Sequence, residues 1–257
     1  MEPDDEIVEA TGPAVPQGGD LIKRHSLVTR VWHWINALAI VIMLMSGLMI
    51  FNAHPRLYWG EFGANPDNAW LEIAETNGVA FPGWATIPST YSLADARLWH
   101  LAFAWVLSLG LLFYLIWGLV CGHIIRDLHI RLAEWKPSHI WDDIKHHAAL
   151  RFPTGPAALR YNVLQKLAYC GVLFVLLPLI ILTGLTMSPN LNAGLTVLLD
   201  LFGGRQSARS LHFIAAFGLV GFFLVHIAMV VLAGPINEVR SMITGWYRLP
   251  KDKGDTA

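Results

Sequence analysis

Residues 211–233 read LHFIAAFGLVGFFLVHIAMVVLA, an uninterrupted apolar segment that contains two histidines and no Asp, Glu, Lys or Arg. A helix of this length can cross the roughly 30 Å hydrocarbon core of a membrane. His212 and His226 are 14 residues apart, which nearly completes four helical turns, so both imidazoles leave one face about 21 Å apart along the axis. Since an ionisable residue within lipid marks a functional site, the segment predicts a membrane helix with two metal centres at different depths.

The composition of the whole chain is that of a membrane protein. Of its 257 residues, 54% are hydrophobic and 14% are charged, whereas soluble domains contain about 25% charged residues. Three further segments, at about 31–51, 98–120 and 167–187, are long and apolar enough to span a bilayer. We therefore predict an all-α fold, a transmembrane four-helix bundle, with a kink at Pro178 in the third span.

The two ends of the chain are expected to lie outside this bundle. Residues 1–22 are largely acidic, contain Pro and Gly and have no apolar periodicity, which is typical of a disordered tail rather than of a signal peptide. We expect a disordered cytoplasmic tail at 1–22, a membrane domain at 23–247 and a short cytoplasmic tail at 248–257.

The distribution of basic residues predicts the orientation. Lys and Arg cluster before the first span, in the connection 121–166 and after the fourth span, whereas the connection 52–96 contains only Arg56 against five acidic residues. Because cytoplasmic segments carry the excess of Lys and Arg, we expect both termini to be cytoplasmic and the long first loop to be periplasmic. This loop and the short apolar segment 195–202 form either a docking surface for a periplasmic partner or a lid.

Depth in the membrane then pairs the histidines of the spans. His33 and His226 fall on the cytoplasmic side, and His100 and His212 fall on the periplasmic side. Two neutral imidazoles from facing helices suit the axial positions of a six-coordinate haem iron. The chain has two cysteines and no C-x-x-C-H sequence, which excludes covalent c-type haem and an iron–sulfur cluster bound by this chain alone. We expect two non-covalent b haems.

Arginines and glycines near these histidines are candidate haem contacts. Arg30, Arg97 and Arg209 each precede a histidine by three residues, on the membrane-surface side of one helix face. They either pair with haem propionates or extend to the membrane surface without a ligand. Gly47 and Gly184 fall near the periplasmic histidine level, where small residues leave room for a flat macrocycle or serve helix packing.

With these residues in place, the chain resembles a known family over about residues 24–246. The sequences RVWHWIN at 30–36 and RLWH at 97–100, together with His212 and His226, resemble those of the bacterial cytochrome b561 and nickel-hydrogenase b-type cytochrome family. LFGGRQSAR at 201–209 and the Trp-rich first loop resemble a subgroup that partners periplasmic molybdopterin oxidoreductases of the sulfite-oxidase type. The resemblance implies two b haems and electron exchange between the quinone pool and a partner subunit.

We therefore expect an electron-transfer subunit of the bacterial inner membrane rather than a separate enzyme. By family analogy the quinone site lies at the inner end, near the second connection and residues 237–240; a site under the 52–96 loop is the alternative. A rival function is a stand-alone cytochrome that oxidises superoxide and reduces quinone. Another is a metal-ion transporter that uses the histidines as transit ligands. The net charge of −1 argues against a nucleic-acid partner.

Overall fold

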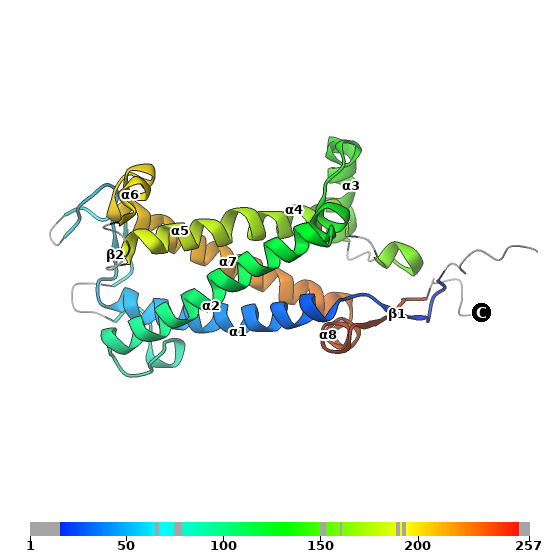
Figure 1. The fold of residues 1–257 in the computed structure, drawn as a ribbon, viewed down its shortest axis with the longest axis horizontal. Helices are drawn as coiled ribbons and strands as arrows, with labels where there is room; N and C mark the ends of the chain where they lie inside the picture. Colours follow the sequence, from blue (N-terminus) through cyan, green and yellow to red (C-terminus); the bar gives the residue numbers. More distant parts are fainter. Residues whose placement is uncertain are drawn as a thin grey trace, which may run out of the picture.

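Four long helices run side by side in the computed structural model, which describes residues 16–64, 67–74, 79–149, 153–159, 161–188, 191 and 194–251 (Figure 1). All four are long and apolar enough to cross a membrane. They are α1 (Leu27–Asn52), α2 (Leu93–Val120), the third span Val163–Met187, and α7 (Arg205–Ala233). The predicted four-helix fold is therefore confirmed, and each helix extends a few residues beyond its predicted span.

The third span changes its winding around a proline. It begins as α4 (Val163–Gly171), widens into the π-helical turn η5 (Val172–Leu176) and continues as α5 (Leu177–Met187). Pro178 stands in the first turn of α5, where it has no N–H to donate and its ring crowds the carbonyl four residues earlier. A π-turn directly before the proline relieves this crowding, since its hydrogen bonds reach one residue further.

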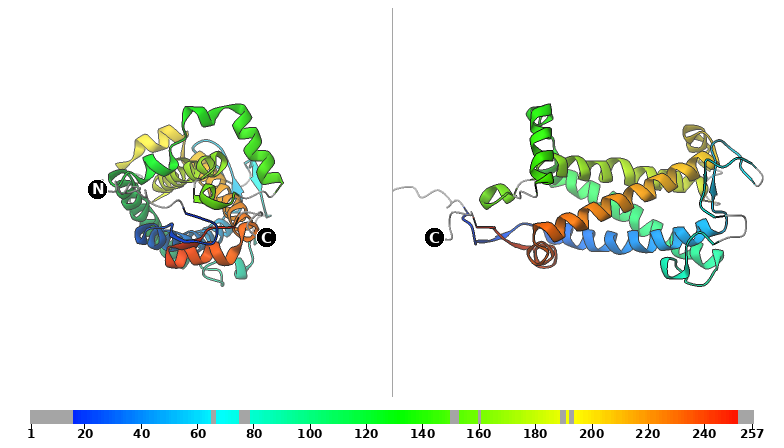
Figure 2. Two further views of the ribbon diagram at one scale, coloured as in Figure 1. Left: turned by 90° about the vertical axis from the view of Figure 1, so that its right-hand side faces the viewer. Right: turned by 180° about the vertical axis from the view of Figure 1, so that it is seen from behind.

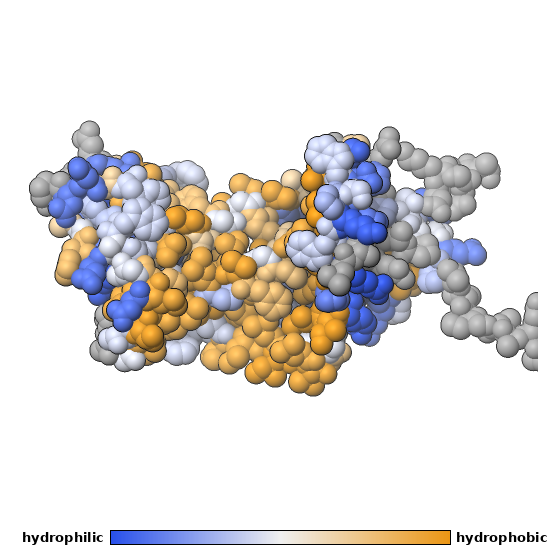
Figure 3. Space-filling view, turned by 90° about the horizontal axis from the view of Figure 1, so that it is seen from above, coloured by the Kyte–Doolittle hydropathy of each residue, from blue (hydrophilic) through white to orange (hydrophobic). Residues whose placement is uncertain are grey.

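The bundle packs as two helix pairs around a thin apolar core. α1 lies mainly against α2, and α5 lies mainly against α7 (Figure 2). Leu107, Leu177 and Leu219 are among the buried residues of this core, while large apolar side chains such as Phe113 and Leu224 are exposed on the outside. Figure 3 shows the result as an apolar middle between two more polar ends, as expected of a bundle surrounded by lipid.

One end of the bundle, here called the terminal end, gathers the second connection and both ends of the described chain (Figure 1). Its elements are β1 (Leu21–Lys23), η2 (Ile124–Leu128), η3 (Leu132–Trp135), α3 (Pro137–Ala148), η4 (Gly155–Leu159), α8 (Pro235–Thr244) and β4 (Trp246–Arg248). β1 and β4 pair antiparallel. The predicted tail boundaries at residues 22 and 248 fall inside this strand pair, and residues 1–15 and 252–257 lie outside the described residues.

The opposite end, the loop end, contains the first connection and the short helix before α7. Its elements are β2 (Arg56–Leu57), β3 (Leu71–Glu72), η1 (Gly83–Ala85) and α6 (Thr196–Phe202). Gly60 joins the loop to the start of α7, because its carbonyl accepts from the backbone of Gln206 and Ser207 and its N–H donates to the Ser207 hydroxyl. The Trp70 indole donates to Ser210 over 2.9 Å. The loop therefore covers the first turns of α7, as a lid does.

Candidate metal centres

The structure brings the four span histidines together as two pairs, one near each end of the bundle. The imidazole centroids of His100 and His212 are 6.1 Å apart at the loop end. Those of His33 and His226 are 6.3 Å apart at the terminal end. These are the pairs that depth in the membrane predicts.

The ring separations fit a metal held between two axial imidazoles. A metal–imidazole bond is about 2 Å long, and the ring centroid lies roughly 1.1 Å beyond the nitrogen, so opposed imidazoles place their centroids about 6.3 Å apart. Both pairs match this separation. Within the described residues no group of three or more His, Cys, Asp or Glu is placed to hold a bare metal ion. A two-imidazole site therefore suits a metal whose remaining ligands come from a macrocycle, as in haem.

Two hydroxyl groups fix the tautomer of the loop-end histidines. His100 Nδ1 lies 3.0 Å from the Ser46 hydroxyl, which also lies 2.7 Å from the Ile42 carbonyl oxygen. The carbonyl can only accept, so the single hydroxyl proton points to the backbone and the hydroxyl accepts from His100 Nδ1–H. This leaves the lone pair on Nε2 free for a metal.

Thr183 does the same for His212. Its hydroxyl lies 3.1 Å from His212 Nδ1 and 2.6 Å from the Leu179 carbonyl oxygen, so Nδ1 of His212 again carries the proton. Ser46 and Thr183 are both fully buried. Sequence reasoning did not select these two residues, although they stand in the matching sequences Ser-Gly-Leu at 46–48 and Thr-Gly-Leu at 183–185.

The two predicted glycines lie against the same imidazoles. A Cβ atom at Gly47 would stand 3.3 Å from His100 Cε1, and one at Gly184 would stand 3.4 Å from His212 Cε1. Each glycine follows the hydroxyl residue that holds that histidine, so the missing side chain lets the ring approach the helix closely enough for the hydrogen bond. The structure thus relates Gly47 and Gly184 to the histidines themselves.

The terminal-end pair has a different environment. His33 lies edge-on to Trp34, and His226 stacks on Phe222 at 5.8 Å. His33 Nδ1 is buried and has no hydrogen-bond partner among the described residues. Aromatic rings rather than hydroxyl groups therefore surround this pair.

The three arginines that look alike in the sequence differ in the structure. Arg30 donates to the Ile243 carbonyl at the end of α8. Arg209 donates to the carbonyl oxygens of His54 and Arg56 in the first loop, and Arg97 is exposed. Arg30 and Arg209 therefore tie connecting segments to the bundle, and Arg97 remains the arginine most open to an external anion.

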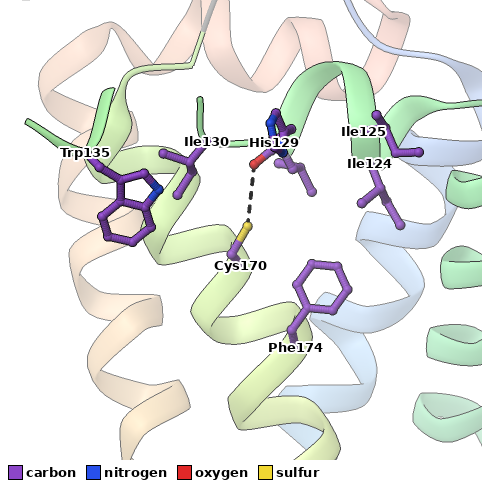
Figure 4. A pocket seen from close by; sticks show the side chains of 8 residues that line it. Ile124, Ile125, His129, Ile130, Trp135, Cys170 and Phe174 are labelled. Carbon is purple, nitrogen blue, oxygen red and sulfur yellow. Dashed lines mark hydrogen bonds between the residues drawn. The ribbon is translucent and has the colours of Figure 1, made fainter. Parts of the chain in front are cut away.

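An apolar cavity lies at the terminal end, between the second connection and the third span (Figure 4). It has a volume of about 330 Å³. Figure 4 shows Cys170 and Phe174 of the third span facing Ile124 and the segment around His129. The cavity is lined by Ile124, Ile125, Leu128, His129, Ile130, Trp135, Cys170 and Phe174. Its lining suits an apolar ligand that enters from the membrane.

Comparison with known proteins gives a family and several distant relatives. The family described as prokaryotic cytochrome b561 matches residues 24–245. YedZ1 of Azospira oryzae, named as a subunit of a protein-methionine-sulfoxide reductase, is 29% identical over 206 residues, which cover 79% of this chain and 87% of the relative. A protein of Azotobacter vinelandii named as a B-type cytochrome subunit of a Ni/Fe-hydrogenase is 25% identical, with 88% of each chain covered.

No solved structure matches the chain significantly. The family match spans all four membrane helices and both histidine pairs. The chain therefore belongs to the prokaryotic cytochrome b561 family, and it is a multi-pass protein of the bacterial inner membrane.

Proposed function

We propose that the chain is a dihaem b-type cytochrome that carries electrons between the quinone pool and a periplasmic redox partner. The observation that supports this most directly is the presence of two facing histidine pairs, each with the ring separation of two axial ligands. The b-type cytochrome family supports haem as the cofactor. When bound, each haem supplies a reversible one-electron couple, while the protein contributes position, orientation and burial.

The residues of each pair have defined roles in this proposal. His100 and His212 hold the loop-end haem through Nε2, since Ser46 and Thr183 keep the proton on Nδ1. His33 and His226 hold the terminal-end haem. The fixed separation of the two levels on α7, about 21 Å along the helix axis, keeps one haem near each membrane surface.

The loop end is the proposed site for the partner. The described part of this end combines exposed apolar side chains, including Phe62, Trp84, Val197 and Leu201, with few basic residues. Exposed apolar side chains of this kind are common where a protein contacts a partner. The resemblance of residues 201–209 and the first loop favours a molybdopterin oxidoreductase as the partner, and the reductase name of YedZ1 is compatible with it.

The apolar cavity at the terminal end supports a quinone site there. It lies in the second connection, on the side that positively charged residues assign to the cytoplasm. Its volume and its apolar lining suit a lipid-soluble ring. The cavity therefore favours the inner of the two quinone positions that the sequence leaves open.

A reduced-minus-oxidised absorption spectrum with haem quantitation tests the proposal on the purified protein. We expect b-type bands and two haems per chain. One haem per chain contradicts the dihaem assignment, and the absence of visible bands together with metal-dependent flux supports the transporter instead. Superoxide-dependent quinone reduction by the purified chain without a partner supports the stand-alone cytochrome.

A further inference from the structure

A hydrogen-bonded chain of three side chains extends from the interior of the bundle to the terminal-end surface. Tyr114, near the end of α2, is buried with 5% of its surface exposed. Its hydroxyl oxygen lies 3.0 Å from His123 Nε2, and His123 Nδ1 lies 2.7 Å from an Asp127 carboxylate oxygen. The carboxylate is partly exposed. The haem sites described above use none of these three residues.

Tyr114 lies at the depth of the terminal-end histidine pair. It follows His100 by 14 residues on the uninterrupted α-helix α2, the spacing that separates His212 from His226. It therefore faces the bundle interior as His100 does, one level further in. The Tyr114 ring stacks on Trp32, the neighbour of His33, with centroids 3.9 Å apart.

The chain of hydrogen bonds has a direction. The Asp127 carboxylate accepts, so His123 Nδ1 carries the proton and donates it. The Nε2 atom of the neutral ring then accepts from the Tyr114 hydroxyl. Burial raises the pKa of Asp127, but hydrogen bonds from Arg126 and His123 outweigh this effect and hold that pKa below its usual value. Asp127 is therefore ionised at neutral pH and can stabilise a protonated His123.

Other titratable groups lie near these three hydrogen-bonded side chains. Tyr161, from the segment before α4, and Cys121, directly after α2, interact electrostatically with Tyr114. His25, in the segment before α1, interacts electrostatically with His123. Burial, followed by the charge of Arg24, lowers the pKa of His25 to about 4. His25 is therefore neutral above about pH 5. Arg126, on η2 itself, is largely exposed and remains charged.

We propose that Tyr114, His123 and Asp127 form a proton relay for the terminal-end site, in which His123 takes up one proton from water for each electron that this site receives. The proposal rests on the haem assignment of His33 and His226. The electron comes from the quinol or from the partner. The Tyr114 hydroxyl passes its proton to Nε2 of His123, so that an N–H bond forms there as the O–H bond breaks, and the Tyr114 oxygen takes a replacement proton from water. This N–H then donates to the Tyr114 oxygen, so the hydroxyl proton turns away from His123. Oxidation of the site reverses both changes.

The equilibrium test is a redox titration of the purified protein between pH 5 and pH 9. Because reduction takes up a proton, the midpoint potential of the terminal-end haem should fall as pH rises. The steepest expected slope is about 59 mV per pH unit, which corresponds to a tenfold change in the equilibrium constant. His123→Gln should abolish this slope, and Asp127→Asn should shift the pH range over which the potential changes to lower pH. His139→Gln, at an exposed histidine on α3 of the same connection, is the matched control and should keep the slope of the unmodified protein.

The kinetic test uses Tyr114→Phe, which removes one oxygen atom and keeps the ring that stacks on Trp32. We expect the midpoint slope to persist while reduction of the terminal-end haem by a quinol analogue slows roughly tenfold, with loss of its solvent isotope effect. Unchanged rates and isotope effect in Tyr114→Phe contradict the role of Tyr114. A pH-independent midpoint in the unmodified protein, or a slope that survives His123→Gln, overturns the relay while the haem assignment stands. Absence of the terminal-end haem overturns both.

Discussion

Ser46 and Thr183 orient the loop-end imidazoles, whereas the described residues provide no hydroxyl partner for His33. A hydrogen-bond acceptor on Nδ1–H fixes the ring and raises the basicity of the opposite nitrogen. The two sites therefore differ in more than depth. The loop-end histidines are held before any cofactor binds, while the terminal-end histidines are positioned by aromatic packing.

Ser46→Ala should weaken haem binding at the loop end and leave the terminal-end haem in place. The variant removes the hydroxyl that accepts from His100 Nδ1–H, and loss of such a partner typically costs 10–100-fold in metal affinity. Haem loss to an acceptor protein, followed by absorbance, measures the effect. Ser241→Ala is the matched control, because Ser241 is another fully buried helical serine that donates to a backbone carbonyl. Equal haem loss from both variants contradicts the orienting role of Ser46.

Removal of single ligands should report the pairing. His100→Ala and His212→Ala should each lose the same haem, because each variant leaves that iron with one axial imidazole. His33→Ala and His226→Ala should lose the other. Redox titration of the four variants identifies which potential disappears in each. A shared loss in His33→Ala and His212→Ala would show that the ligand pairs are assigned wrongly.

At the scale of elements, the helices and the histidine pairs follow from the sequence because both depend on local spacing. Hydrophobic length predicts each span, and the basic connections place each histidine at a depth. The roles of Arg30 and Arg209 do not follow from such spacing. Their partners lie 213 residues away in α8 and about 150 residues away in the first loop, and no periodicity reports those contacts.

The third span likewise combines a feature that its own sequence predicts with one that it does not. Pro178 predicts a local disturbance, since proline removes a donor and crowds the preceding turn. It predicts a kink but not that the helix widens in the turn before the proline. The π-helical turn at Val172–Leu176 packs against α7, and the sequence of the span alone does not specify that packing.

Gly204→Ala should detach the first loop from α7. Gly204 has φ +102°, and a Cβ atom there would stand 2.6 Å from the Gly60 carbonyl oxygen. Gly203→Ala is the control, because Gly203 also has positive φ but a Cβ atom there would make only an ordinary van der Waals contact, 3.8 Å from Ser207 Oγ. We expect Gly203→Ala to cost about 1–2 kcal/mol in the free energy of unfolding from backbone strain alone, and Gly204→Ala to cost clearly more.

Thermal unfolding and limited proteolysis of the 53–92 loop measure the difference between the two glycine variants. Faster cleavage in Gly204→Ala than in Gly203→Ala is the expected result, since only the former displaces the loop backbone. Equal cleavage rates would show that the contact of Gly60 with α7 does not hold the loop.

At the scale of the whole molecule, the two ends differ in charge as they do in structure. Basic residues of the terminal end come from segments far apart in the sequence. They include Lys23, Arg24, Arg126, Arg131, Lys136, Lys145, Arg240, Arg248 and Lys251. The connection 52–96 contributes only Arg56, which is paired with Glu72 over 2.6 Å. This charge asymmetry between the two ends is the physical basis for the proposal that the terminal end lies in the cytoplasm.

Cysteine labelling tests that orientation in a chain with both native cysteines replaced by serine. Phe62→Cys and Trp141→Cys place thiols at exposed positions of the loop end and of α3, respectively. A membrane-impermeant maleimide should label Phe62→Cys in intact spheroplasts and Trp141→Cys only after lysis, since the reagent reaches the periplasmic face alone. Each variant is the control for the other, because labelling of both after lysis shows that both thiols are accessible. The reverse pattern would place the loop end in the cytoplasm, and a partner that docks there would then have to be cytoplasmic.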